Sequence, residues 1–333
     1  MRRLLGGWLL GTAAAALLLP APAAGQEAGA QFRTPWGDPD LQGIWDTDAL
    51  RSVPLERDPE YGARAVITDE ELAARVAREQ LRAVDDPSVR PDGDRENLRT
   101  PVHWDEWSDS PSPRTSLIVD PPDGRIPPLT LAAQHRQIDP STVIGFAGGS
   151  FGDGPFNGAD DFNPIDRCIT RGLPNTWFPS LYNNGFQIVQ NRDYVVILYE
   201  RLHEHRIIPL DGRAPLDANI RTWFGDSRGR WEGDTLVVEV TNFGDQTNYR
   251  GAGAGLRLTE RYSRVDAETV RVEITVNDPS TWTQPWTAVI EGKSDPSYWQ
   301  IFEYACHEAN YNMTFMLEAA RAEDRAAEEQ GQR

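Results

Sequence analysis

Between Thr115 and Glu308 the sequence repeats one pattern, a short apolar run followed by a tight turn. Runs flank the turns at Asn191-Arg192-Asp193 and Asp266-Ala267-Glu268, and another pair flanks Gly229 or Gly233 in "GRWEGDTLVVEV". Apolar residues that alternate with polar ones are typical of half-buried strands, and no helical pattern intervenes. Roughly nine or ten short strands joined this way predict an antiparallel barrel or sandwich, with a barrel expected over 115–308.

Three further parts surround this β segment. Residues 1–25 carry two early arginines, an apolar run and small residues, which is typical of a secretory signal peptide. Residues 26–114 form an N-terminal extension with one helix, predicted in "ITDEELAARVAREQLRAV" with Thr68 as its N-cap. Residues 309–333 are expected to form a C-terminal helix and a charged tail. The extension should wrap around a mainly β core.

Charge and cysteine content restrict the partners and the compartment. The formal net charge is −18, and no basic patch offers a surface to nucleic acid or to an anionic membrane. No stretch after the signal approaches the roughly 20 apolar residues of a membrane span. We expect a periplasmic or secreted protein of unknown oligomeric state. Cys168 and Cys306, the two cysteines, either form a disulfide or stay buried thiols; export favours the disulfide.

Several sequence blocks recur in a known group of proteins. They are "PDLQGIW", "RTSLIVDPPDGRIPPLT", "RCITRGLPN", "YNNGFQIVQ", "RIIPLDGR", "GDSRGRWEGDTLVVEVTNF" and "EYACHEANY". Together they resemble a large family of exported bacterial proteins, most of which have no assigned activity, so the resemblance implies export but no reaction. The Gly-Arg-Trp-Glu-Gly-Asp turn followed by an alternating strand also resembles calycin-like up-and-down barrels. That second resemblance concerns the fold alone.

The stretch "YERLHEHRI" carries the first candidate site residues. On an unbroken strand Glu200 and Glu204 share one face, while Arg201, His203 and His205 share the other. His203 and His205 could bind zinc if His307 supplied a third ligand. Because the family block matches only His203, we expect no metal here. The alternatives are an exposed pair of histidines and a proton-transfer role for His203.

The stretch "EYACHEANY" carries the second candidate. On a strand Cys306 and His307 point to opposite faces, so a cysteine nucleophile with an adjacent base is not expected. We expect Cys306 to be structural and His307 to face a pocket and exchange protons, together with Tyr182, Glu200 and His203. The alternative is a histidine that only caps the last strand.

A turn-rich loop, "RGLPNTWFPSLYNNGFQI", supplies the expected substrate-binding residues. Aromatic rings beside amides and a guanidinium are common in pockets for ring-bearing ligands. The residues concerned are Arg171, Trp177, Asn183 and Asn184. The alternative is that the asparagines make a turn and the tryptophan covers the end of the barrel.

Three functions remain open. The first is a cofactor-independent lyase or isomerase that uses acid–base chemistry on an aromatic or phenolic small molecule with an acidic group. The second is a periplasmic carrier of an apolar or aromatic ligand. The third is a metal-dependent hydrolase or lyase using His203, His205 and His307. The sequence holds no G-x-S-x-G, H-E-x-x-H, Walker or dinucleotide motif, and no cofactor is expected.

Overall fold

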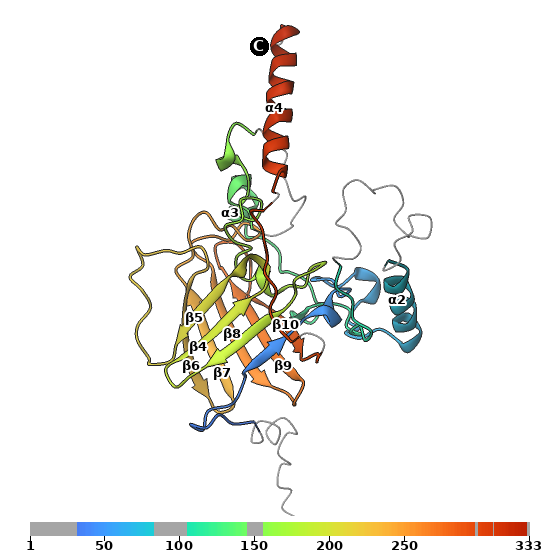
Figure 1. Cartoon of the computed structure of the whole chain (residues 1–333), viewed down its shortest axis with the longest axis vertical. Coiled ribbons are helices and arrows are strands. Elements are labelled where there is room, and N and C mark those ends of the chain that lie inside the picture. The colour runs from blue at the N-terminus through green and yellow to red at the C-terminus, as the bar shows by residue number, and fades with distance from the viewer. Residues whose placement is uncertain (1–31, 83–104, 145–155, 297–298, 309, 332–333) are drawn as a thin grey trace, which may run out of the picture.

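The computed structural model describes residues 32–82, 105–144, 156–296, 299–308 and 310–331 (Figure 1). The predicted signal peptide at 1–25 lies outside these residues. Within the described ranges, ten strands form two antiparallel sheets. The smaller sheet has the order β1–β3–β4–β5, with β1 at Gly43–Trp45, β3 at Phe186–Gln190, β4 at Tyr194–Tyr199 and β5 at His205–Pro209.

The larger sheet has the order β2–β10–β9–β8–β7–β6. Its strands are β2 at Ile118–Asp120, β6 at Asp226–Glu232, β7 at Thr235–Thr241, β8 at Arg257–Arg264, β9 at Thr269–Asn277 and β10 at Trp286–Lys293. From β3 to β5 and again from β6 to β10, each strand pairs with the next one in the sequence. The chain is therefore mainly β, and this consecutive antiparallel order agrees with the sequence pattern.

The two sheets meet along two seams without closing a barrel. At one seam Asp46 and Lys293 form a single antiparallel bridge, with both N···O distances at 2.8 Å. At the other seam, β5 and β6 share no bridge within the described ranges. There Ile208 and Leu210 lie over Gly229, where an added Cβ would come within 2.8 Å of the Ile208 side chain. Because β5 packs its side chains on the backbone of β6, the prediction of a closed barrel is wrong.

The hydrophobic core fills the space between the sheets. In β9, Val270, Val272, Ile274 and Val276 are buried, while the residues between them are half-buried. Strands β4, β8 and β10 alternate in the same way over most of their length. Full burial of such a side chain contributes about 1.5–3 kcal/mol. The alternation visible in the sequence therefore positions the core correctly.

In the part of the chain that the structure describes, three α-helices lie outside the sheets. Helix α2, Asp69–Arg82, begins after Thr68, whose hydroxyl accepts from the Glu71 amide while the Glu71 carboxylate accepts from the Thr68 amide. This capping box confirms the predicted start of the helix. Helix α3 is a single turn at Leu131–Gln134. The predicted C-terminal helix is α4, Asn312–Glu329, which stands out from the body of the protein (Figure 1).

The end of the predicted strand series is wrong. Residues 301–306, which the pattern over 115–308 was expected to include as a strand, have no regular secondary structure and join no sheet. Strand β2, far earlier in the chain, pairs with β10 at the edge of the larger sheet. Within the described ranges, no helix combines the length and the apolar character that crossing a membrane requires.

Candidate functional site

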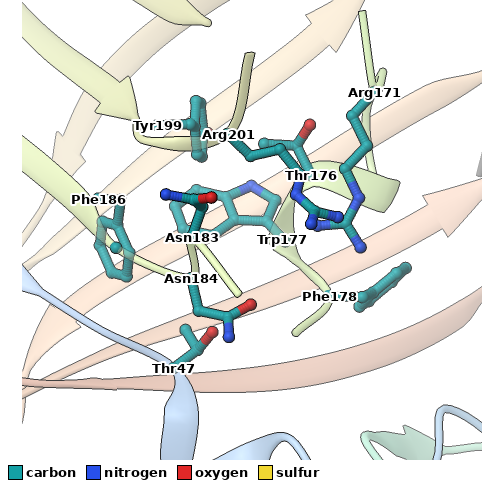
Figure 2. A pocket seen from close by; sticks show the side chains of 11 residues that line it. Thr47, Arg171, Thr176, Trp177, Phe178, Asn183, Asn184, Phe186, Tyr199 and Arg201 are labelled. Atoms are coloured by element: carbon teal, nitrogen blue, oxygen red, sulfur yellow. The ribbon is translucent and has the colours of Figure 1, made fainter. Parts of the chain in front are cut away.

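A pocket lies where the loop before β3 meets the end of β4 (Figure 2). Its empty volume of about 300 Å³ includes open solvent, and the part enclosed by side chains is far smaller. The lining residues come from the loop, from β3 and β4 and from the segment after β1: Thr47, Arg171, Thr176, Trp177, Phe178, Asn183, Asn184, Gly185, Phe186, Tyr199 and Arg201. The four residues expected to bind substrate, Arg171, Trp177, Asn183 and Asn184, are thus all brought together here.

A buried polar network lies beneath the pocket. Arg206 of β5 and Glu260 of β8 form an ion pair at 2.8 Å between the two sheets. Trp177 donates its indole N–H to Glu260 at 3.0 Å, and the Tyr262 hydroxyl donates to the same carboxylate at 2.7 Å. Tyr199, which also lines the pocket, lies 3.1 Å from Arg206. This network fixes the orientation of the Trp177 and Tyr199 rings.

The pocket contains two arginines that are almost fully buried. The Arg171 side chain donates no hydrogen bond to any described residue, and its Nε is buried without a partner. Burial first, and then the positive charge of Arg201, lower the pKa of Arg171 to about 9. Arg201 donates to Ser180 Oγ at 2.8 Å and lies 4.5 Å from the centre of the Tyr182 ring, while its own Nε also lacks a partner.

A buried carboxyl group, Glu204, lies behind Thr176. Thr176 lines the pocket, and its hydroxyl donates to Glu204 Oε2 at 3.0 Å. Glu204 also accepts from the Thr170 hydroxyl and from the Arg171 amide. Burial raises the pKa of Glu204 to about 7, although these hydrogen bonds lower it. A carboxyl group with this pKa can gain and lose a proton near neutrality.

Two more carboxyl groups, from outside the β3–β5 region, hold Asn184. The Asn184 side-chain amide donates to Asp48 Oδ1 at 2.9 Å, and the Asn184 backbone amide donates to Glu106 Oε2 at 3.0 Å. Burial first, and then the charge of Asp46, raise the pKa of Asp48 to about 6. Burial and the charge of Asp48 raise the pKa of Glu106 to about 7. The pocket therefore has a cationic wall and, behind Asn184, an acidic one.

Three of the four expected catalytic residues gather at the segment 302–304. Glu200, fully buried, accepts from the Phe302 amide at 2.8 Å. His203 Nε2 accepts from the Tyr304 amide at 2.9 Å. The Tyr182 ring stacks on the Tyr304 ring, with centroids 6.3 Å apart. Glu200 and His203 hold a main-chain segment in place, a structural task that the sequence did not indicate.

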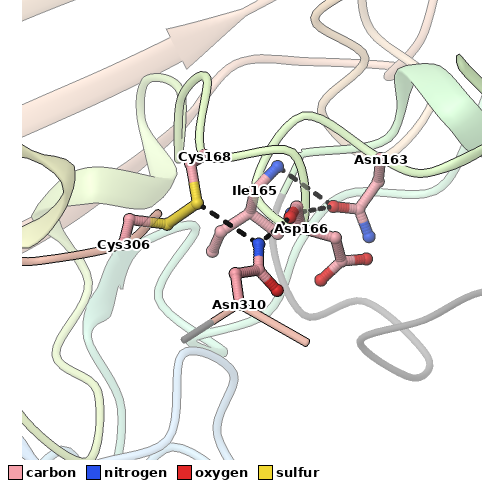
Figure 3. The surroundings of a disulfide bond; sticks show 6 residues. All are labelled: Asn163, Ile165, Asp166, Cys168, Cys306 and Asn310. Carbon is pink, nitrogen blue, oxygen red and sulfur yellow. Dashed lines mark hydrogen bonds between the residues drawn. A yellow bond between two sulfur atoms is a disulfide. The ribbon is translucent and has the colours of Figure 1, made fainter. Parts of the chain in front are cut away.

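The disulfide prediction is confirmed and the placement expected for His307 is not found. Cys168 and Cys306 are bonded, with their Cα atoms 5.8 Å apart (Figure 3). Asn310 closes over the bond, donating to the Asp166 carbonyl and to Cys168 Sγ. His307 is exposed and absent from the lining of the pocket. Because 301–306 is not a strand, the alternation that was expected to turn His307 inward does not apply.

The three histidines of the metal hypothesis do not form a ligand set. Within the described residues no group of three or more His, Cys, Asp or Glu side chains is arranged to hold a metal ion. The Nε2 atom of His203 already accepts a backbone hydrogen bond.

Several polar residues of the site were missed or assigned no role by sequence reasoning. Glu260 stands between Leu258 and Tyr262 on the inward face of β8, and a charge at an inward position was a usable signal. Glu204 was considered only as part of an unbroken strand. In the structure a 3₁₀ turn at Arg201–His203 interrupts that strand, with Leu202 and His203 in the left-handed region. Asp48 and Glu106 lie in segments that showed no pattern.

Comparisons of this chain with protein-family models, with curated proteins and with solved structures found no match.

Proposed function

We propose that the chain is a cofactor-independent lyase or isomerase that moves protons on a small aromatic molecule bearing an acidic group. One observation supports this most directly. Thr176 lines the pocket and its hydroxyl donates to Glu204, so the hydroxyl oxygen can receive a proton from a ligand bound beside it. A hydroxyl backed by a carboxylate with a pKa of about 7 is suited to general base catalysis.

The proposed step is a double proton transfer. A ligand C–H or O–H proton moves to Thr176 Oγ while the hydroxyl proton of Thr176 moves to Glu204 Oε2. The electron pair left on the ligand then shifts a double bond or expels a leaving group. The guanidinium groups of Arg171 and Arg201 stabilise the negative charge that develops. Since Glu204 accepts only when ionised, turnover should rise as the pH increases through about 7.

The test is a screen of aromatic acids against the purified protein, first for binding by thermal shift and then for conversion by NMR. We expect a bound compound to be converted, with turnover at least about 10²-fold lower in Glu204→Gln and Thr176→Val. Thr176→Ser, which keeps the hydroxyl, should retain most of the activity. If both variants turn over at the wild-type rate, this mechanism is wrong. The role expected of His307 stays a prediction, which His307→Ala tests in the same assay.

A carrier is the second candidate, and one observation favours it. Glu200 and His203 accept hydrogen bonds from main-chain amides, and Tyr182 packs between Arg201 and Tyr304. Few of the expected proton-transfer groups therefore face the pocket. Recovery of every bound compound unchanged from the screen would favour the carrier over the enzyme.

Export to an oxidising compartment and membership of the exported bacterial family belong to the same proposal. The Cys168–Cys306 disulfide is compatible with that compartment. The open two-sheet arrangement with consecutive strands supports a distant relation to calycin-like folds, with one seam left unpaired.

A further inference from the structure

Arg171 is held in a position that costs stability. Its side chain is only 4% exposed, and no described residue accepts a hydrogen bond from its guanidinium. Buried arginines are normally paired with a carboxylate or with carbonyl oxygens, because an unpaired buried charge is strongly destabilising. Glu204 and Asn175 hydrogen-bond to the backbone of Arg171. These contacts fix the main chain and do not pair with the guanidinium.

A second guanidinium increases that cost. Figure 2 shows the Arg171 and Arg201 guanidinium groups side by side at the pocket, and Arg201 acts on Arg171 as a like charge. The nearest carboxyl group, Glu204, directs its oxygens to two threonine hydroxyls and a backbone amide. Asp48 and Glu106 are occupied by Asn184. The described groups thus leave the two cations without a bonded anion.

We propose that Arg171 and Arg201 bind the carboxylate of a small ring-bearing acid. Guanidinium forks match the planar geometry of a carboxylate, and such charge-assisted hydrogen bonds are among the strongest in proteins. Phe178 and Trp177 line the same pocket, and Tyr182 and Tyr304 stack beside Arg201. These rings fit the aromatic part of the ligand. The net charge of −18 repels free anions from most of the protein surface. The two adjacent arginines are therefore a local positive site in an otherwise acidic protein.

This inference rests on the pocket of the proposed function but not on the proton transfer proposed there. Benzoate is the probe ligand. Titration calorimetry should show benzoate binding to the wild-type chain. Arg171→Met keeps an unbranched stem and removes the guanidinium and its charge, and it should weaken benzoate binding at least about tenfold, the scale of one lost charge-assisted hydrogen bond. Without benzoate, the same variant should unfold at a temperature equal to or above that of the wild type.

That second readout separates a binding residue from a structural one. A residue that stabilises the fold would lower the unfolding temperature when removed, whereas an unpaired buried charge should raise it or leave it unchanged. Arg201→Lys keeps the charge but loses the fork, and it should weaken benzoate binding without loss of the folded state. The matched control is Arg213→Gln, which removes a remote, exposed arginine paired with Asp211; it should change benzoate affinity less than about twofold.

Two further ligands test the chemistry. Benzyl alcohol keeps the ring without the charge, and inorganic phosphate keeps a charge without the ring; both should bind more weakly than benzoate. Equal affinity for phosphate, equal affinity in Arg171→Met, or a marked loss of stability in unliganded Arg171→Met would each overturn the proposal. Benzoate binding that depends on Arg171, combined with no turnover of any aromatic acid, would retain this site and reject the enzyme. Turnover that depends on Glu204 but not on Arg171 would do the reverse.

Discussion

At the scale of single residues, the charged groups inside this protein differ in how well they are paired. Arg206 and Glu260 form a satisfied pair, with Tyr199, Tyr262, Ser227 and Trp177 completing their hydrogen bonds. Arg171 lies in the same interior without such partners. A satisfied pair serves structure, whereas an unsatisfied charge next to a pocket is more readily explained by a ligand.

This contrast gives a prediction for the satisfied pair. Arg206→Met leaves the Glu260 carboxylate buried without its cation, and it should lower the free energy of unfolding by about 3–5 kcal/mol. The double variant Arg206→Met/Glu260→Leu removes both charges and should be more stable than the single variant. Urea denaturation followed by tryptophan fluorescence measures both. A single variant as stable as the wild type would mean that the pair contributes nothing.

Some of these residues could be predicted from the sequence and others could not. Arg171, Trp177, Asn183 and Asn184 were found because aromatic, amide and guanidinium groups lie close together in one loop. Asp48 and Glu106 reach Asn184 from segments far away in the chain, and no local pattern reports such a contact. Glu204 was misplaced because two consecutive left-handed residues, Leu202 and His203, break the strand whose alternation was assumed.

At the scale of elements, several contacts hold the segment Ile301–Cys306 beside the pocket. They include the Glu200 contact to Phe302, the His203 contact to Tyr304, the stacking of Tyr182 on Tyr304 and the disulfide at Cys306. The sequence predicted the disulfide correctly but made the segment a strand. The apolar run was present, yet it pairs with no described strand, and backbone pairing depends on a neighbour that the run itself cannot specify.

These contacts predict the effect of removing the disulfide. The double variant Cys168→Ser/Cys306→Ser opens a loop of 138 residues and should lower the free energy of unfolding by about 2–4 kcal/mol. Amides of Phe302 and Tyr304 should then exchange hydrogen at least about tenfold faster, because the covalent attachment at Cys306 is gone and only non-covalent contacts hold the segment. Hydrogen exchange measured by mass spectrometry checks this. Unchanged exchange would show that the non-covalent contacts suffice.

At the scale of the whole molecule, strand order was predictable and closure was not. Hairpin turns between consecutive strands are local, so the sequence reveals them one at a time, as at Asp266-Ala267-Glu268 between β8 and β9. Closure depends on how β5 meets β6 across the molecule. Ile208 and Leu210 pack on Gly229 at this contact. No sequence pattern around these three residues predicts that they meet.

Buried carboxyl groups predict how the stability of the whole molecule depends on pH. Burial raises the pKa of Asp46 and Asp48 to about 6, and that of Glu106, Asp166 and Glu204 to about 7. In the unfolded chain these groups titrate near pH 4. Between about pH 4.5 and 7 the folded state therefore holds more protons than the unfolded state, and linkage requires that stability fall as the pH rises through this window.

The free energy of unfolding should consequently be larger at pH 5 than at pH 7.5, by about 2 kcal/mol or more. Urea denaturation at the two pH values measures the difference. Asp48→Asn keeps an oxygen for the Asn184 amide and removes a charge that burial opposes, so it should stabilise the protein at pH 7.5 and reduce the pH dependence. Asp123→Asn, at an exposed turn, is the matched control and should leave the dependence unchanged. Stability that rises from pH 5 to 7.5 would show that these carboxyl groups are not buried in the folded protein as the structure places them.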